Sequence, residues 1–509
     1  MFAKQLSFMQ SYHLLILWSF FLCFEVNATN YDIRAFGAKG DGKTLNTVFI
    51  QAAIDQAHVE GGGVVVIPEG YYLTGSIWMK SGVTLHLKKR AVLLGSTNFK
   101  DYARGYKWMA MILARDAIDI GITGKGTIDG QGAALGLHLD SLFYAGKIDS
   151  KHYHFVEKRV WHEFRPQLIE FFRCSGIQIR QVTMKNASSW VQSYEQCNRI
   201  TIDQMTVDSD AYWNNDGIDL VDCQKVRMTR CHINASDDGI CIKSEDFSLA
   251  QINEDIYIAD CTVRSSASAI KFGTSLVSGA RNVVIQNIKV YDTFRSAIAI
   301  EATQGGFIEN VLVEKIRAKN TGNAIFMRIG RVRGAEKAGP LKNVTIRDVK
   351  VEVPFEAPDL KYTIRGPALS TFANTFPSSI TGNPGVYVEN VRIENVSIKY
   401  PGRGNKAYAN MPLYRIKDVP ELETSYPEFS MFGELPAWGF YVRHVKGISF
   451  RNVELKIEEP DYRPAMVFDD VHDLCIESLT VRGDDKAAAV YYQDVSDIKC
   501  ENIQVILRK

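Results

Sequence analysis

The sequence has little net charge, little proline and almost no helical periodicity. Its 59 Lys and Arg residues against 58 Asp and Glu residues leave a formal charge of +1, so no overall field attracts nucleic acid or an anionic membrane. Only 15 prolines accompany 38 glycines in 509 residues, which excludes a collagenous or disordered chain. A chain of this length with 46% hydrophobic residues can bury a large core. We therefore expect a globular protein that does not bind nucleic acid.

The first 28 residues are predicted to be a secretion signal rather than part of the fold. Lys4 precedes an apolar run at residues 14–22, and residues 26–28 (VNA) offer small side chains at a cleavage site. The run is short for a membrane span, and no later stretch is long and apolar enough. An uncleaved anchor is the alternative. We expect a secreted or periplasmic monomer, not inserted in a membrane, whose residues 29–509 form one domain.

A short apolar pattern recurs from about residue 180 onward. Each copy has apolar side chains at its first, fourth and sixth positions, as in Ile179, Val182 and Met184. The copies follow at intervals of 23 to 33 residues, apart from two of 47 and 57. Such a period, with short β-type units, is typical of a solenoid. The repeat predicts an all-β protein, a single right-handed parallel β-helix, with a short capping helix at residues 47–58.

The cysteines fit the same pattern. Eight remain after the signal, and five stand at places that favour Val or Ile in a buried stack: Cys174, Cys197, Cys223, Cys231 and Cys261. Although a secreted chain with eight cysteines would normally suggest disulfides, we expect mostly free thiols that behave as small hydrophobic side chains.

Three segments interrupt the pattern. The two long intervals mark insertions at residues 354–384 and 401–438, and an aromatic-rich excursion spans 102–164. Loops longer than about 15 residues without internal structure tend to be functional lids. Plain surface loops are the alternative.

The residues that begin the strand of each turn are predicted to form one column. Its members are Gln167, Trp190, Asp216, Asp238, Ser268, Ser296 and Asn323. Neighbours in such a column lie about 4.8 Å apart, so Asp216 and Asp238 should be adjacent. Asp237 must point elsewhere, and Asp219 follows on the same face as Asp216.

These carboxylates fit the chemistry of glycosidic bond cleavage. Acids so close together would repel one another if all were ionised. Glycosidic cleavage needs one protonated acid to assist the leaving group and one ionised acid to activate water. Asp-Gly pairs are also common in turns, and oxygen ligands suit a Ca²⁺ site, so both alternatives stay open.

Two segments around these residues are similar to a known family. Residues 214–219 (NNDGID) and 236–244 (SDDGICIKS) resemble the Asn-x-Asp and Gly-Asp-Asp signatures of family 28 glycoside hydrolases, the polygalacturonase family. Residues 35–42, 61–64 and 122–132 look like the opening segments of pectin-active β-helices. The resemblance covers about residues 31 to 505.

The resemblance implies inverting hydrolysis of a pectic polysaccharide without a metal or cofactor. Asp237 would be the general acid, and Asp216 and Asp238 would activate the water. Asn214 and Asp219 would bind substrate.

Two family elements are replaced. The histidine of Gly-His-Gly corresponds to Ser268, and Arg-Ile-Lys, which grips a galacturonate carboxylate, corresponds to residues 299–301 (AIE). This departure fits another sugar, as in the rhamnogalacturonan-active branch.

Several other residues are candidates for substrate contact. Lys243, Lys271 and Arg328 are candidate replacement cations, and Ser268 is a further candidate. Trp190 is either a sugar platform or a packing residue.

Two sets of polar residues lie further away. His162 and Arg165 enter the turn two before Asp216 and are candidates for the cleft. His444, Asp469 and Asp470 are interpreted as structural.

We expect exo-action, because the three excursions flank the Asp216–Asp238 segment in the sequence. Two other classes of function remain. A polysaccharide lyase would need Ca²⁺ and a base such as Lys243 or Lys271. A non-catalytic carbohydrate-binding β-helix would bind glycans without turnover.

Overall fold

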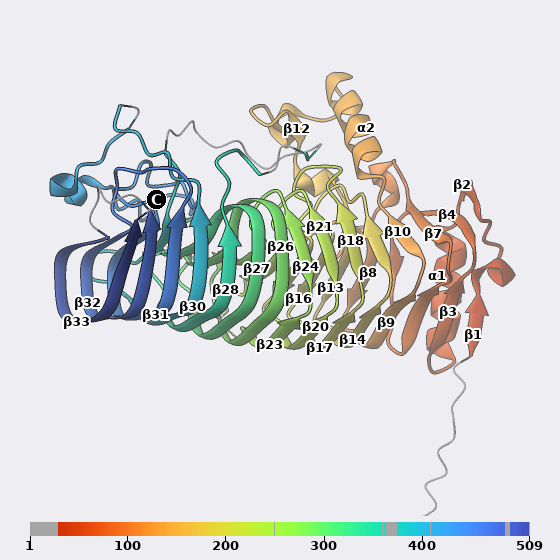
Figure 1. Ribbon diagram of the computed structural model, residues 1–509. Coiled ribbons are helices and arrows are strands. Elements are labelled where there is room, and N and C mark those ends of the chain that lie inside the picture. Colours follow the sequence, from red (N-terminus) through yellow and green to blue (C-terminus); the bar gives the residue numbers. More distant parts are fainter. Residues whose placement is uncertain are drawn as a thin grey trace, which may run out of the picture.

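The computed structural model describes residues 29–248, 250–358, 361–362, 374–407, 409–483 and 489–507. In these residues the chain winds into a right-handed parallel β-helix, whose turns stack along one axis (Figure 1). A typical turn contributes one strand to each of three faces, as β13 (Gln167–Phe172), β14 (Ser175–Arg180) and β15 (Thr183–Lys185) do. The predicted all-β solenoid is confirmed. The signal expected at residues 1–28 lies outside the described residues.

Helix α1 (Thr47–Val59) packs at the N-terminal end, where the capping helix was expected. It buries Ile50, Ala53, Ile54 and Ala57, the spacing of one helical face. The first strands are β1 (Asn30–Asp32), β2 (Asp41–Leu45), β3 (Gly63–Ile67), β4 (Gly70–Thr74), β5 (Ile77–Trp78), β6 (Val83–Leu87), β7 (Ala91–Gly95), β8 (Ala110–Arg115), β9 (Ile118–Gly124) and β10 (Thr127–Asp129), with 3₁₀ turns η1 (Ile33–Phe36) and η2 (Phe99–Asp101).

The central turns carry short strands and the later turns carry long ones that run around the corners. The short strands are β16 (Gln192–Glu195), β17 (Asn198–Asp203), β18 (Thr206–Ser209), β19 (Ile218–Val221), β20 (Gln224–Thr229), β21 (His232–Ala235), β22 (Ile240–Ser244), β23 (Asn253–Ala259), β24 (Thr262–Ser265) and β25 (Ile270–Leu276). The later strands are β26 (Gly279–Ala302), β27 (Phe307–Ile329), β28 (Leu341–Glu352), β29 (Ser378–Thr381), β30 (Val388–Tyr400), β31 (Phe440–Ile457), β32 (Met466–Gly483) and β33 (Val490–Leu507).

The apolar repeat sets the register of the strands. Ile179 pairs with Ile202, and Ile346 pairs with Ile393 across the interval of 47 residues. Ile393 in turn pairs with Phe450 across the interval of 57. These side chains belong to one buried core that runs from Tyr31 to Val481. The insertions therefore leave the stacking of the turns intact.

Asparagines fix one corner of the later turns. Asn282, Asn310, Asn343 and Asn390 all have φ between 54° and 57°, a left-handed conformation that asparagine tolerates better than most residues. The side-chain amide of Asn343 donates to the amide oxygen of Asn310 at 3.1 Å, and Asn390 donates to Asn343 at 3.1 Å. Each corner is thus tied to the one before it.

The predicted excursion at 102–164 is wrong in its first part, because strands β8, β9 and β10 lie within it and pair with the turns on either side. Their apolar residues are those of ordinary solenoid strands. The chain leaves the solenoid after β10 and forms helix α2 (Gly132–Tyr144), short strands β11 (Tyr153–His154) and β12 (Arg159–Val160), and 3₁₀ turns η3 (Ser150–His152) and η4 (His162–Phe164). Figure 1 shows this part rising from the upper edge of the solenoid.

The insertion at 401–438 packs back onto the outside of the solenoid. It contains the 3₁₀ helix η5 (Leu413–Asp418). Its buried residues form a second apolar cluster against Ala299, Phe326 and Tyr441, whose outer members include Ile416, Val419, Phe429 and Phe432. Strand β29 lies inside the other predicted insertion and belongs to the solenoid, while residues 359–360 and 363–373 lie outside the described part.

The eight cysteines of the described chain are free, and six are buried. Cys174, Cys197 and Cys223 stack at the same place in successive turns, and the sulfur of Cys197 accepts from the backbone N–H of Cys174 at 3.3 Å. The predicted thiol stack is confirmed.

Candidate active site

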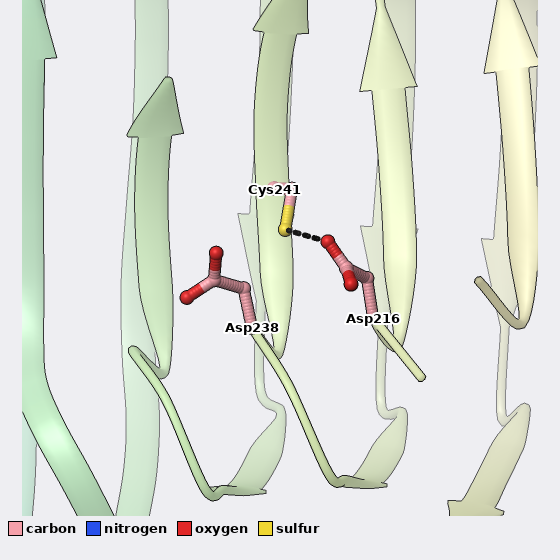
Figure 2. Close-up of side chains that lie close together, drawn as sticks. All are labelled: Asp216, Asp238 and Cys241. Atoms are coloured by element: carbon pink, nitrogen blue, oxygen red, sulfur yellow. Dashed lines mark hydrogen bonds between the residues drawn. The ribbon is translucent and has the colours of Figure 1, made fainter. Parts of the chain in front are cut away.

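Asp216 and Asp238 lie at the same place in neighbouring turns, two residues before strands β19 and β22, which pair in register. The backbone N–H of Gly217 donates to the carbonyl oxygen of Asp238 at 2.9 Å. Figure 2 shows Cys241 on β22 with its sulfur pointing toward Asp216. Carboxylate oxygens of both aspartates and this sulfur all lie within 4.8 Å of one another. The predicted adjacency of Asp216 and Asp238 is confirmed.

Lys243 connects Asp216 to Asp219. Its Nζ lies 2.7 Å from Oδ2 of Asp216 and 2.6 Å from Oδ1 of Asp219. Burial raises the pKa of Asp219 to about 6, against the opposing effect of Lys243. Burial also raises the pKa of Asp216. Burial disfavours the charge of Lys243, but the two aspartates outweigh this and raise its pKa well above the ordinary value. The lysine is therefore the fixed positive charge beneath Asp216.

Asp238 is held ionised by its own set of partners. The backbone N–H of Ser268 donates to Oδ1 at 2.9 Å, and Nζ of Lys271 lies 3.3 Å from Oδ2. Burial opposes ionisation, but Lys271 and Arg295 outweigh it and hold the pKa of Asp238 below its ordinary value. Lys271 also lies 3.8 Å from Glu301, whose pKa burial raises to about 7.

Asp237 has the opposite electrostatic character. Burial and then the neighbouring charge of Asp238 raise its pKa. The side-chain amide of Asn214 donates to Oδ2 of Asp237 at 3.3 Å. The amide oxygen of Asn214 accepts from Arg159 and, at 2.9 Å, from Nη2 of Arg165, which orients its NH₂ group toward Asp237. The pKa of Asp237 is thus shifted upward, whereas the pKa of the neighbouring Asp238 is shifted downward.

The carboxylates open into a cavity of about 380 Å³, within the range of small-molecule sites. Its lining includes Asn214, Asp216, Asp237, Asp238, Lys107, Trp108, His162, Trp190, Lys243, Arg333 and Tyr426. Nζ of Lys243 lies over the ring of Trp190, 3.8 Å from the ring centroid. Trp108 meets the edges of Trp190 and His162, at centroid distances of 6.2 and 4.5 Å. Aromatic rings and carboxylates therefore line the same cavity.

The structure brings most of the predicted residues to this cavity. Asn214, Lys243, Trp190 and His162 line it. Arg165 is 1% exposed and acts through Asn214. Burial and the nearby Arg165 lower the pKa of His162 to about 4, so this side chain is neutral.

Four predicted substrate contacts need correction. Asp219 and Lys271 are 0% and 1% exposed and bind their ion-pair partners, so neither reaches the cavity. Ser268 is 3% exposed, and its backbone N–H is what contacts Asp238. Arg328 lies beneath the 401–438 insertion, where it donates to the carbonyl oxygens of Gly382 and Glu421 at 2.6 and 2.5 Å.

The polar cluster around His444 lies elsewhere. His444 contacts Asp470 at 2.6 Å and Glu421 at 3.1 Å, and Asp469 pairs with Arg443 at 3.0 Å. None of these side chains lines the cavity of the carboxylates. Their contacts agree with the structural interpretation.

Sequence reasoning missed several residues of the site. Nε of Arg295 lies 3.0 Å from Oε2 of Glu428, and Tyr426 reaches the cavity from the same insertion. Arg295 precedes Ser296 as Asp237 precedes Asp238, so extending the predicted column by one position would have found it. Lys107, Tyr426 and Glu428 belong to segments without periodicity and gave no signal.

The cluster of Asp216, Asp238 and Cys241 is a poor match for calcium. Ca²⁺ prefers six to eight oxygen ligands, whereas a thiol is one of three donors here. Lys243 and Lys271 already compensate the two carboxylates at 2.7 and 3.3 Å. The donors do not support the calcium alternative.

Fold and site together define a solenoid protein with a cavity in which paired aspartates border aromatic rings. Residues 63–415 match the family described as glycosyl hydrolases family 28. The chain belongs to this family.

Relatives and solved structures agree with this assignment. The chain is 28% identical to a probable polygalacturonase of Vitis vinifera over 336 residues, which are 62% of this chain and 60% of that protein. It is 42% identical to an exo-poly-alpha-D-galacturonosidase of Dickeya chrysanthemi over 118 residues, 20% of this chain and 19% of that protein. The chain thus spans less than two thirds of the length of these two relatives.

Two solved structures share the fold. A family 28 exopolygalacturonase of Yersinia enterocolitica superposes with a TM-score of 0.66 at 19% identity, covering 88% of this chain and 78% of that one. An exopolygalacturonase of Thermotoga maritima gives 0.57 at 22% identity, with 73% and 87% covered. At these identities the likeness establishes the fold alone.

Proposed function

We propose that this family 28 chain is a secreted or periplasmic glycoside hydrolase that cleaves a pectic polysaccharide with inversion and acts from a chain end. The observation that carries the proposal is the electrostatic division between two adjacent residues. Asp237 has a raised pKa, whereas the pKa of Asp238 is lowered. Inverting hydrolysis requires this division between an acid and a base.

In the proposed reaction Asp237 donates its proton to the glycosidic oxygen as the bond to the anomeric carbon breaks. Asp238, supported by Asp216, removes a proton from the water that attacks the opposite face of the sugar. Lys243 and Lys271 keep the two carboxylates compensated during the step. The products are a new reducing end of inverted configuration and a released alcohol.

The 401–438 insertion supports exo-action. Phe429 and Phe432 pack against Ala299 and Phe326, which lie on strands beyond Asp238 along the solenoid. Tyr426 of the same insertion lines the cavity. An open groove for a long polymer would need this surface free, so the covered face favours a chain terminus.

The replacement of the family's Arg-Ile-Lys motif at residues 299–301 indicates which sugar the site accepts. Ala299 stands at the family arginine position and is buried beneath the insertion. Glu301 stands at the family lysine position and faces Lys271. Neither Ala299 nor Glu301 lines the cavity, so these two positions supply no cation to a sugar carboxylate. This supports a rhamnogalacturonan-type substrate over polygalacturonan.

Product analysis tests the proposal. The full chain is incubated with polygalacturonate and with rhamnogalacturonan oligosaccharides, and the anomeric configuration of the first product is followed by proton NMR. We expect release of short products of inverted configuration. An unsaturated product that absorbs in the ultraviolet and needs Ca²⁺ would establish a lyase, and glycan binding without turnover would establish a binding protein; either result overturns the proposal.

Localisation has its own test. No helix among the described residues is long and apolar enough to cross a membrane. We propose that residues 1–28 direct export and are removed. N-terminal sequencing of the protein recovered outside the cytoplasm should begin near residue 29, and retention of the intact N-terminus in the membrane fraction would contradict this.

A further inference from the structure

A second hollow of about 490 Å³ lies beside the catalytic cavity. The two share Lys107, Glu245 and Ser275 in their linings. Lys107 forms an ion pair with Glu245, which joins the segment before β8 to the segment after β22. The ion pair therefore belongs to the lining of both hollows.

Two buried polar groups in the second hollow lack partners. Glu195 is 3% exposed, and its Oε1 has no hydrogen-bond partner within the described chain. Oε1 of Gln304 is likewise buried and without a partner there. A buried polar atom without a partner destabilises the fold. Such atoms in the lining of a hollow therefore favour a ligand that forms hydrogen bonds with them.

The neighbouring carboxyl groups are already satisfied. Glu170 accepts from three backbone N–H groups, those of Tyr106, Lys107 and Trp108. Asp222 accepts from Ser278 and from the backbone of Glu245, each at 2.8 Å. Glu195 stands out against them. Burial, and then Glu170, raise the pKa of Glu195 to about 8, so near neutral pH this side chain is mostly the uncharged acid, a donor as well as an acceptor.

Two aromatic rings form the rim. Phe247 is 77% exposed and Tyr106 is 47% exposed, although both line the hollow. The ring of Tyr106 stacks on Phe172 at a centroid distance of 3.7 Å, which fixes its orientation. Exposed aromatic faces beside buried hydrogen-bonding groups match the apolar C–H faces and the hydroxyl groups of a sugar ring.

The charges of the lining select against an anion. Lys107 is the only cation among the described lining residues, and Glu245 neutralises it. Glu195, Asp222 and Glu245 are the lining acids. A uronic acid would bring its carboxylate close to these groups, whereas a neutral sugar would not.

We propose that this hollow is a subsite for a neutral sugar, which holds a branch of the pectic chain while the backbone occupies the catalytic cavity. The proposal rests on the proposed function for the identity of the backbone. Phe247 and Tyr106 contact the faces of the branch sugar, and Glu195 and Gln304 bond its hydroxyl groups.

The test measures binding and turnover separately. Full-length Asp237→Asn protein is titrated by calorimetry at neutral pH with galactotriose and arabinotriose, and with the galacturonate trimer as the anionic counterpart. Phe247→Ala should weaken binding of one of the neutral trisaccharides about tenfold, which corresponds to about 1.4 kcal/mol. Phe355→Ala is the matched control, because Phe355 is also an exposed phenylalanine, 49% accessible, but lies outside the hollow.

A second pair of variants tests the polar contacts. Glu195→Gln retains a neutral side chain with a donor and an acceptor and should keep the affinity, whereas Glu195→Ala should lose it. The proposal is overturned if neither neutral trisaccharide binds, if Phe247→Ala and Phe355→Ala bind them equally, or if Phe247→Ala weakens the galacturonate trimer as much as the neutral ones.

A turnover assay distinguishes failure of the proposed subsite from failure of the proposed hydrolase activity. Wild-type protein is assayed on branched and unbranched rhamnogalacturonan fragments, and the ratio of their kcat/KM values should fall about tenfold in Phe247→Ala. If Phe247→Ala cleaves normally and the ratio is unchanged, the subsite proposal is overturned and the proposed hydrolase activity stands. Neutral trisaccharide binding that depends on Phe247, without any cleavage, supports the subsite and overturns the proposed hydrolase.

Discussion

Replacing Lys271 by methionine is expected to move the acidic limb of the pH–rate profile to higher pH. Asp238 must be ionised to accept a proton from water, so activity falls as the pH falls through its pKa. Lys271 is 1% exposed and lies 3.3 Å from Oδ2 of Asp238, and it is the main group that lowers that pKa. Removing the charge of Lys271 raises the pKa of Asp238, so the enzyme loses activity at the acidic end of its pH range.

The magnitude follows from the distance and the burial. An opposite charge within about 4–6 Å lowers an aspartate pKa by about 1–3 units. Arg295 and the backbone N–H of Ser268 remain in the variant and still lower the pKa of Asp238. The rise in this pKa should therefore be smaller than the largest value in that range. We expect the acidic limb to rise by about 1–2 units, or about 1.4–2.7 kcal/mol.

The assay is the initial rate of reducing-end release on a rhamnogalacturonan oligosaccharide, measured as kcat/KM across the acidic and neutral range. Lys271→Arg retains the charge and is the matched control. Because methionine leaves Glu301 without its cation, the double variant Lys271→Met/Glu301→Gln separates a pH effect from lost stability. A folded, active Lys271→Met protein whose acidic limb stays within about 0.3 units of the wild type would refute the reasoning.

Further expectations concern the acid, the mode of attack and the domain. Asp237→Asn should lower kcat by about 10²–10⁴ with KM nearly unchanged, because the amide keeps the shape but cannot supply the proton; a loss of less than about threefold would contradict the role. Substrate viscosity should fall slowly relative to reducing-sugar release, whereas an early viscosity drop with a ladder of oligosaccharides would indicate an open groove. Limited proteolysis should cut within 354–384 and 401–438 without releasing stable halves, and a fragment that refolds alone would show more than one domain.

The central and later turns could be predicted because their constraint is local and periodic. Every turn must place apolar residues at the same three positions, so the pairing of Ile346 with Ile393 follows from the sequence across a long insertion. The same register predicts that Asp216 and Asp238 are adjacent. The apolar pattern does not reveal strands β8 to β10, because aromatic and glycine-rich stretches around residues 110–129 obscure its periodicity.

The walls of the site could not be predicted in the same way. Tyr426 lines the cavity and Glu428 pairs with Arg295, and both come from an irregular insertion. The docking of this insertion depends on contacts with Ala299 and Phe326, far away in sequence. Arg328 shows the converse, since its strand position faces outward but the insertion covers it. Register determines which way a side chain points, whereas only tertiary packing determines whether it meets solvent, substrate or another part of the chain.

The stacked thiols of Cys174, Cys197 and Cys223 make the protein's sensitivity to oxidation differ between its folded and unfolded states. Burial raises the pKa values of Cys197 and Cys223, and neither sulfur is accessible, so oxidants reach mainly the exposed Cys500 in the native protein. Unfolding exposes all of these thiols at once, and none of the cysteines in the described residues is held in a disulfide. Heating in air then allows random cross-links that trap the unfolded chain, so thermal inactivation becomes irreversible unless a reductant is present.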